Sequence, residues 1–426
     1  MEDMTILMPL VGAAVRSTEA EIAFEFVWPV RNLVCKLLRS VFTQAAGRSS
    51  GSGMTEVRLI LTSDWQYGAR HYPDPTKGRP VSFVFIGLPA SEMENPLLIP
   101  LAGHEIGHAV WSAGEFAKQE VIDCYKTAIE LLRSHFPNYK DMFLPRTPSS
   151  FGAVDRNAYP EFYGGQYWIT SLCLAVRQAE EIFCDSLGLR LFGNAYLHAF
   201  AYVASPQPGK ERPPNYPDVK LRASHLCEAA AKWGIAPPDR YMDLFREQSV
   251  GFSYDARTKA LIRLVSDTCK DLQPENKGQM DLIGDAGKDL DPQAQARFKL
   301  ISDTSSALAA SLADKASDVA YQAGIPAPAV DAEEQNRICD AYDRLVPYPA
   351  ARSFTDLLNA AWNVYLHPDK WLESVRGRIK KSDDTEAIER VLKDIVLKNI
   401  EIFTIEQIPR NPSDPEQDGS CGTTTT

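Results

Sequence analysis

Apolar and polar positions along the chain divide it into two unlike parts. Residues 17–42 carry apolar side chains at helical spacing. Two short runs, Val57–Leu61 and Val81–Ile86, are bounded by Pro and Gly and rich in β-branched or aromatic residues, which predicts strands. Beyond Pro237 the pattern predicts helices and no strand. We therefore expect an α+β, predominantly helical protein, in which a domain with a small sheet is followed by an all-helical domain.

Three longer helices stand out from this pattern. Asn95 followed by Pro96 is typical of a helix start, and helical spacing then continues to about His135. A second long helix is predicted from about Gln166 to Phe192, after a proline-rich stretch. The clearest amphipathic pattern lies near the end of the chain, over residues 384–405.

Breaks between these elements predict four segments. We expect an N-terminal helical segment at 1–45, a mixed α/β domain at 46–235 and a helical domain at 236–408. A flexible connector begins at Gly47, where Gly and Ser dominate. The last segment, 409–426, is polar, contains proline and ends in four threonines, so we expect it to be disordered.

Charge and cysteine content narrow the class of protein. Lys and Arg number 45 against 56 Asp and Glu, a net charge of -11, which disfavours nucleic acid as the main partner. No apolar stretch approaches the roughly 20 residues needed to span a bilayer. The 8 cysteines form no CxxC pair and the first residues do not resemble a signal peptide, so we expect reduced thiols and a cytoplasmic location.

The segment 101–111 contains the motif His104-Glu105-x-x-His108. On a helix the two histidines, four residues apart, share a face, so both imidazoles can reach one metal ion. Zinc lowers the pKa of bound water to about 7, and Glu105 stands beside the ion as the base that takes the proton. The competing interpretation is a helix with two structural histidines.

A third protein ligand is normally needed for a catalytic zinc. Glu181 and Asp185, four residues apart on the second long helix, share a face, so one can bind metal while the other orients a ligand histidine. We expect Glu181 to be the ligand and Asp185 the orienting group. Glu180 points about 100° away and is expected to face solvent. Cys184 is interpreted as a small buried residue rather than a ligand.

Together the HExxH motif and the Glu181-x-x-x-Asp185 helix resemble the gluzincin zinc metallopeptidases. The segment 181–185, Glu-Ile-Phe-Cys-Asp, is similar to the Glu-x-x-Ala-Asp form of the HtpX-like and CAAX-prenyl-protease-like branch. This resemblance implies that residues 46–235 form a zincin-like metallopeptidase domain. That branch usually carries transmembrane helices, which this chain lacks, so the chain resembles a soluble relative and a prenylated substrate is not implied.

A third element of that branch, His-Pro-x-x-x-x-Arg, is matched by Tyr216, Pro217 and Arg222. The match implies that Arg222 is a structural cation of the active site. Tyr216 replaces the family's histidine, which faces the substrate oxyanion, and a tyrosine hydroxyl can donate to an oxyanion as well. Tyr216 as a packed loop aromatic and Arg222 as a surface arginine are the alternatives.

The predicted function is hydrolysis of peptide bonds in a cytosolic protein or peptide, with Zn²⁺ held by His104, His108 and Glu181. By analogy with other zincins, the strand Val81–Ile86 is a candidate edge strand for an extended peptide, with a buried core strand as the alternative. A second function is a catalytically silent, zinc-stabilised interaction module. A deformylase-type reaction requires a cysteine ligand ahead of the motif, and Cys35, the only upstream cysteine, has no matching motif.

Overall fold

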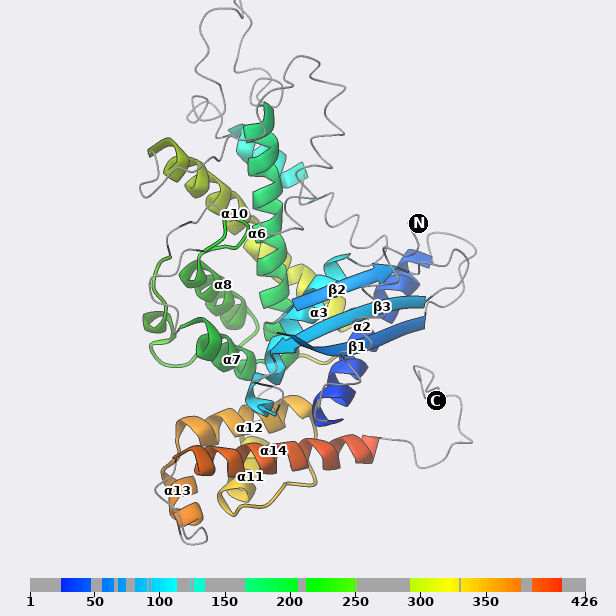
Figure 1. Ribbon diagram of the computed structural model, residues 1–426, viewed down its shortest axis with the longest axis vertical. Coiled ribbons are helices and arrows are strands. Elements are labelled where there is room, and N and C mark those ends of the chain that lie inside the picture. Colours follow the sequence, from blue (N-terminus) through cyan, green and yellow to red (C-terminus); the bar gives the residue numbers. More distant parts are fainter. Residues whose placement is uncertain are drawn as a thin grey trace, which may run out of the picture.

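The computed structural model describes residues 24–46, 56–64, 68–73, 81–89, 92, 94–112, 123, 126–134, 165–205, 212–248, 250, 292–328, 331–376 and 385–407. Within these ranges the chain is predominantly helical, with one small sheet (Figure 1). The first half contains α2 (Phe24–Ala46), β1 (Glu56–Asp64), β2 (Gly68–Pro73), β3 (Val81–Pro89), η2 (Pro96–Leu101), α3 (Ala102–Ser112), α6 (Gly165–Phe192), α7 (Asn194–Ala204), α8 (Val219–Lys232) and η3 (Tyr241–Leu244). The second half contains α10 (Pro292–Gln322), α11 (Ala332–Asp343), α12 (Phe354–Leu366), α13 (Asp369–Arg376) and α14 (Thr385–Gln407).

The sheet has the strand order β1-β3-β2, with β1 parallel and β2 antiparallel to β3. Both long edges of β3 are therefore paired. Val84 and Ile86 on β3 are fully buried. The interpretation of 81–86 as an open edge strand for peptide is wrong, and the alternative, a buried core strand, is confirmed. Sequence analysis missed β2, whose 6 residues include a glycine and a proline and lack a clear alternating pattern.

The segment leading into α3 is a buried 3-10 turn. Asn95 caps it as predicted, accepting a hydrogen bond on its side chain from the Leu97 amide at 3.3 Å, and Pro96 follows at the first helical position. The indole Nε1 of Trp362, on α12, donates to the Leu97 carbonyl at 3.0 Å. This bond ties the start of the HExxH helix to the C-terminal helices. α3 is described up to Ser112, and helix is described again at 123 and 126–134. The part of the predicted helix at 113–122 lies outside the described residues.

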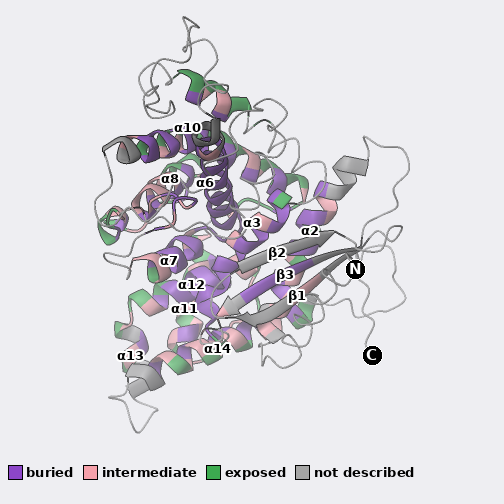
Figure 2. Ribbon diagram, turned by 45° about the horizontal axis from the view of Figure 1, so that its top comes forward, coloured by how far each residue is buried: buried purple, intermediate pink, exposed green. Residues whose placement is uncertain are grey.

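The predicted second long helix is α6, which runs through the middle of the molecule (Figures 1 and 2). Every residue from Ser171 to Phe192 is buried. A helix that is covered on all sides has no solvated face, so each polar side chain on it needs a partner inside the protein. α3 crosses it closely because glycines stand at the contact: a Cβ at Gly103 would lie 2.8 Å from the Gly188 Cα.

The C-terminal helices complete the core around α6. α10 packs along α6, and α12 contacts η2, α7 and α14. One continuous set of buried apolar residues extends from Val30 on α2 to Ile400 on α14. The elements described beyond 237 are helices joined by turns, with no named strand and one isolated bridge between Arg212 and Val250, in line with the expected helical region. The boundary at 235/236 stays a prediction.

Several predictions lie outside the described residues: the connector beginning at Gly47, the proline-rich stretch ahead of the second long helix and the disordered tail at 409–426. None of the described helices is long and apolar enough to cross a membrane.

Four cysteines of the described part are free, namely Cys173, Cys184, Cys227 and Cys339. Cys35, in contrast, is disulfide-bonded. The expectation of reduced thiols throughout is therefore wrong at Cys35. The cytoplasmic location inferred from reduced thiols loses that support, because stable disulfides form mainly in oxidising compartments.

Candidate metal centre

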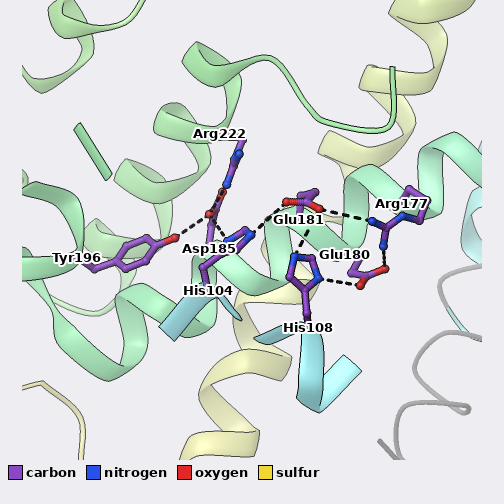
Figure 3. A network of polar contacts seen from close by, with 8 residues as sticks. All are labelled: His104, His108, Arg177, Glu180, Glu181, Asp185, Tyr196 and Arg222. Carbon is purple, nitrogen blue, oxygen red and sulfur yellow. Dashed lines mark hydrogen bonds and ion pairs between the residues drawn. The ribbon is translucent and has the colours of Figure 1, made fainter. Parts of the chain in front are cut away.

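α3 presents His104 and His108 to the middle of α6 (Figure 3). The two rings are 4.9 Å apart between centroids and nearly perpendicular, and each side chain is only 12% exposed. The Nε2 atom of His104 lies 3.2 Å from one carboxylate oxygen of Glu181, and that of His108 lies 3.6 Å from the other. Both imidazoles thus direct the same ring nitrogen toward one carboxylate.

The Nδ1 atoms of both histidines are held by two other carboxylates of α6. Asp185 Oδ1 lies 2.9 Å from His104 Nδ1, and Glu180 Oε1 lies 2.8 Å from His108 Nδ1. With Nδ1 donating to a carboxylate, the lone pair of each neutral ring stands on Nε2, which is the form that binds metal. The expectation that Glu180 faces solvent is wrong, since this residue is 2% exposed. The side of α6 that carries Glu180, about 100° around the helix from Glu181, is covered by protein rather than exposed to solvent.

Asp185 is anchored from two further helices. Arg222 on α8 contacts both carboxylate oxygens, at 2.7 Å through Nε and 2.8 Å through a terminal nitrogen. Tyr196 on α7 donates its hydroxyl to Oδ1 at 2.7 Å. Although burial opposes ionisation, the Arg222 guanidinium holds the pKa of Asp185 well below its usual range. The sequence pattern did not single out Tyr196, because only the tertiary packing of α7 on α6 brings it to the site.

Glu181, the predicted third ligand, is fully buried between the two Nε2 atoms. Neither of its carboxylate oxygens receives a well-aligned hydrogen bond from the described residues. Burial opposes its ionisation, but the neighbouring histidines and Arg222 lower its pKa. A buried carboxylate without hydrogen bonds is costly unless a cation lies beside it.

The charges around Glu181 are unequal. Four buried carboxylates, those of Glu105, Glu180, Glu181 and Asp185, stand close to two guanidiniums, those of Arg177 and Arg222. With neutral histidines, four negative and two positive groups leave two negative charges, which one divalent cation would neutralise. A protonated His104 imidazole would supply one of these positive charges. Burial opposes its charging, yet contacts with Asp185 and Glu181 raise the pKa of His104 to about 10.

Glu105, the predicted base, is 6% exposed on α3. Burial raises the pKa of its carboxyl group, and the adjacent histidines offset part of that effect. A carboxylate whose pKa lies nearer neutrality is better suited to accept a proton from water and to return it.

His104 and His108 form, together with Cys184, a group that could hold a metal ion. Each of the three residues offers one ligand atom, and these atoms lie within 4.8 Å of one another. Cys184 is fully buried, and its sulfur packs against the backbone of α3, where a Cβ on Gly107 would lie 2.9 Å away. Burial and four nearby carboxylates raise the pKa of its thiol well above the usual value. A thiolate here would also add a fifth negative charge.

The other candidate residues lie apart from this cluster or in different contacts. Tyr216 is half-buried in the turn before α8, and its carbonyl accepts a hydrogen bond from Arg212. Its role as oxyanion donor stays a prediction. His198 stacks on Trp362, with ring centroids 5.5 Å apart. His225 contacts Ser306 and Glu228.

Comparisons with protein-family models, curated proteins and solved structures found no match for this chain. The argument for function therefore depends on the geometry and chemistry of the cluster around Glu181.

Proposed function

We propose that the protein is a zinc-dependent metallopeptidase of the gluzincin type, in which His104, His108 and Glu181 hold the metal. The observation that carries this proposal is the buried Glu181 carboxylate, which lies 3.2 and 3.6 Å from two imidazole Nε2 atoms and receives no aligned hydrogen bond. The excess of two negative charges supports a divalent ion. Two histidines with one carboxylate are a frequent ligand set of catalytic zinc.

Zinc bound there would polarise a carbonyl group and acidify a water molecule. Glu105 would accept the proton of the attacking water and return it to the leaving amine, so that no net proton is consumed in the step. Asp185 and Glu180 hold the imidazole Nδ1 atoms, and Arg222 keeps Asp185 ionised and in place. Tyr216 is the proposed donor to the substrate oxyanion.

The proposed substrate is a peptide or protein, as the resemblance of the two motifs to gluzincins implies. The zincin-like domain of this proposal comprises residues 46–235. Because β3 is the central strand, an extended peptide would have to pair with β1 or β2 instead.

One observation favours a second function, a zinc-stabilised interaction module without turnover. The histidine side chains are only 12% exposed, and the surrounding carboxylates 6% or less. A structural zinc ion needs no access for a substrate, whereas a catalytic zinc keeps one coordination position open to water and substrate.

Turnover decides between the two functions. Zinc-loaded wild type and Glu105→Gln would each be incubated with a proteome-derived peptide library, and new N-termini would be identified by mass spectrometry. The peptidase proposal predicts new N-termini with wild type only, while both proteins retain zinc. Equal products from the two proteins would remove Glu105 as the base. No products from either protein, with zinc bound, would favour the interaction module.

A further inference from the structure

His108 is linked through hydrogen bonds and ion pairs to a set of charged side chains that all belong to α6 (Figure 3). His108 Nδ1 lies 2.8 Å from one oxygen of Glu180, and the other oxygen accepts a hydrogen bond from Arg177. A second guanidinium nitrogen of Arg177 lies 3.7 Å from Glu181. The side chain of Arg177 is 5% exposed and that of Glu180 2%.

Helical spacing explains how one guanidinium reaches both carboxylates. Glu180 and Glu181 follow Arg177 by three and four residues, which are the two positions that neighbour it on a helix surface. Arg177 therefore lies between a group that orients a histidine and the proposed ligand. The corresponding support of His104 is built differently, because Asp185 is anchored by Arg222 and Tyr196 from other helices.

Such a pair is expensive to bury. Moving two charges out of water costs several kcal/mol each, and apolar residues of similar volume are often as stable or more so. A purely structural role would therefore gain little from Arg177 and Glu180. Their geometry has a specific consequence instead, since Glu180 fixes which nitrogen of His108 carries the proton and where Nε2 points.

We propose that Glu180 and Arg177 are positioning residues of the metal centre: Glu180 orients His108, and Arg177 fixes Glu180 while restraining Glu181. This inference rests on the proposed zinc site and adds a second group of residues that orients its ligands, beside Asp185, Arg222 and Tyr196. Neither residue touches the substrate in this account. Both act through His108 and Glu181.

The test is the double variant Arg177→Met/Glu180→Leu. It removes one charge of each sign, so the formal charge of the cluster is unchanged, and Glu181, which loses Arg177, keeps its contacts with both histidines. Zinc affinity would be measured by competition with a chromophoric chelator, and stability by urea unfolding of the metal-free protein. We expect stability close to wild type and zinc affinity lower by about 10- to 100-fold, the usual effect of removing a group that orients a ligand. Wild-type affinity in the folded double variant would overturn the proposal.

A single variant, Glu180→Gln, covers the case in which the double variant does not fold. The Gln amide oxygen can still accept a hydrogen bond from His108, but the substitution removes the charge that pairs with Arg177. Arg177 can then pair with Glu181 in competition with the metal, so we expect a loss of zinc affinity of similar size. The matched control is Glu228→Gln, at an exposed glutamate that contacts His225, and it should leave affinity unchanged. Equal affinities in all three proteins would contradict the proposed positioning role.

Histidine NMR separates this inference from the zinc proposal. In metal-free protein with ¹⁵N-labelled histidine, the wild-type His108 signal should show a hydrogen-bonded Nδ1 proton, and the double variant should lose it. If wild type binds no zinc but this signal changes as described, the metal proposal fails and the positioning contact stands. If wild type binds zinc and the signal does not change, the positioning role fails alone.

Discussion

Gly107 of α3 lies directly against Cys184 of α6, so closely that a Cβ at Gly107 would lie 2.6 Å from the Cys184 Cα. The two histidines lie one helical turn apart on α3, and this close approach brings them against the carboxylates of α6. The absence of a side chain at Gly107, the second variable position of the HExxH motif, is thus a condition for the site's geometry.

Gly107→Ala should therefore separate α3 from α6. The contact is with backbone, which cannot rotate away, so we expect a loss of stability of about 1–3 kcal/mol or more, and weaker zinc binding. Urea unfolding and a zinc competition titration measure the two effects. Glu228→Gln, at an exposed position of α8, is the control and should leave both quantities nearly unchanged. A Gly107→Ala protein with wild-type stability would contradict the close contact.

Asp185→Asn should lower the stability of the protein far more than its small change in side-chain shape implies. The carboxylate accepts from Arg222, His104 and Tyr196, and its neutralisation leaves the Arg222 guanidinium, whose side chain is only 16% exposed, without its counter-charge. Breaking a buried pair in this way costs about 3–5 kcal/mol. Chemical denaturation of the metal-free proteins provides the comparison, and a loss below about 1 kcal/mol would show that the pair is not buried as described.

Tyr196→Phe tests the same carboxylate more gently. The substitution keeps the ring, which packs against Gly188, and removes only the hydroxyl that donates to Asp185 at 2.7 Å. Because Arg222 still holds Asp185, we expect a loss of stability of about 1.5–3 kcal/mol, the range for a hydrogen bond to a charged group. Zinc affinity should fall less than in Asp185→Asn. An equal fall in both variants would assign Tyr196 a larger part in positioning His104.

The stability of the protein should decrease in mild acid through His198. Burial, together with the nearby His367, lowers the pKa of His198 from 6.5 to about 4. A histidine whose pKa is lowered by folding contributes its full stability above pH 6.5, and that contribution is lost as the pH falls toward 4.

His198→Phe, which keeps an aromatic ring against Trp362, should therefore flatten the pH dependence between these values. For a single titrating histidine, the slope of the unfolding free energy against pH is at most about 1.4 kcal/mol per pH unit, so the two proteins should differ in slope by no more than this. Urea unfolding of both proteins at several pH values checks it, and parallel pH profiles would rule out this role of His198.

Local spacing carried much of the sequence-based prediction. The four-residue separations of His104 and His108, and of Glu181 and Asp185, predict shared helix faces without knowledge of tertiary structure. The cap at Asn95 and the long helices near α6 and α14 also follow from local rules and are confirmed.

What the sequence could not predict depends on how the helices pack. Glu180 was assigned to solvent because its rotation about α6 differs from that of Glu181, but α6 is buried on every side. Tyr196 joins the site only through the packing of α7, and β3 became a central strand because β2 pairs with its second edge. The disulfide at Cys35 likewise depends on a pairing that scattered cysteines do not reveal.

His104, His108 and Glu181 are proposed to hold a divalent metal ion, and the metal content of the purified protein tests this proposal. Wild type, His104→Ala, Glu181→Ala and Cys184→Ala would be purified without added metal, and their zinc content would be measured by inductively coupled plasma mass spectrometry. We expect about one zinc per chain in wild type and in Cys184→Ala, and loss of zinc in the other two. Zinc that is kept in Glu181→Ala and lost in Cys184→Ala would make Cys184 the third ligand, and wild type that binds no zinc even after reconstitution would contradict the proposal itself.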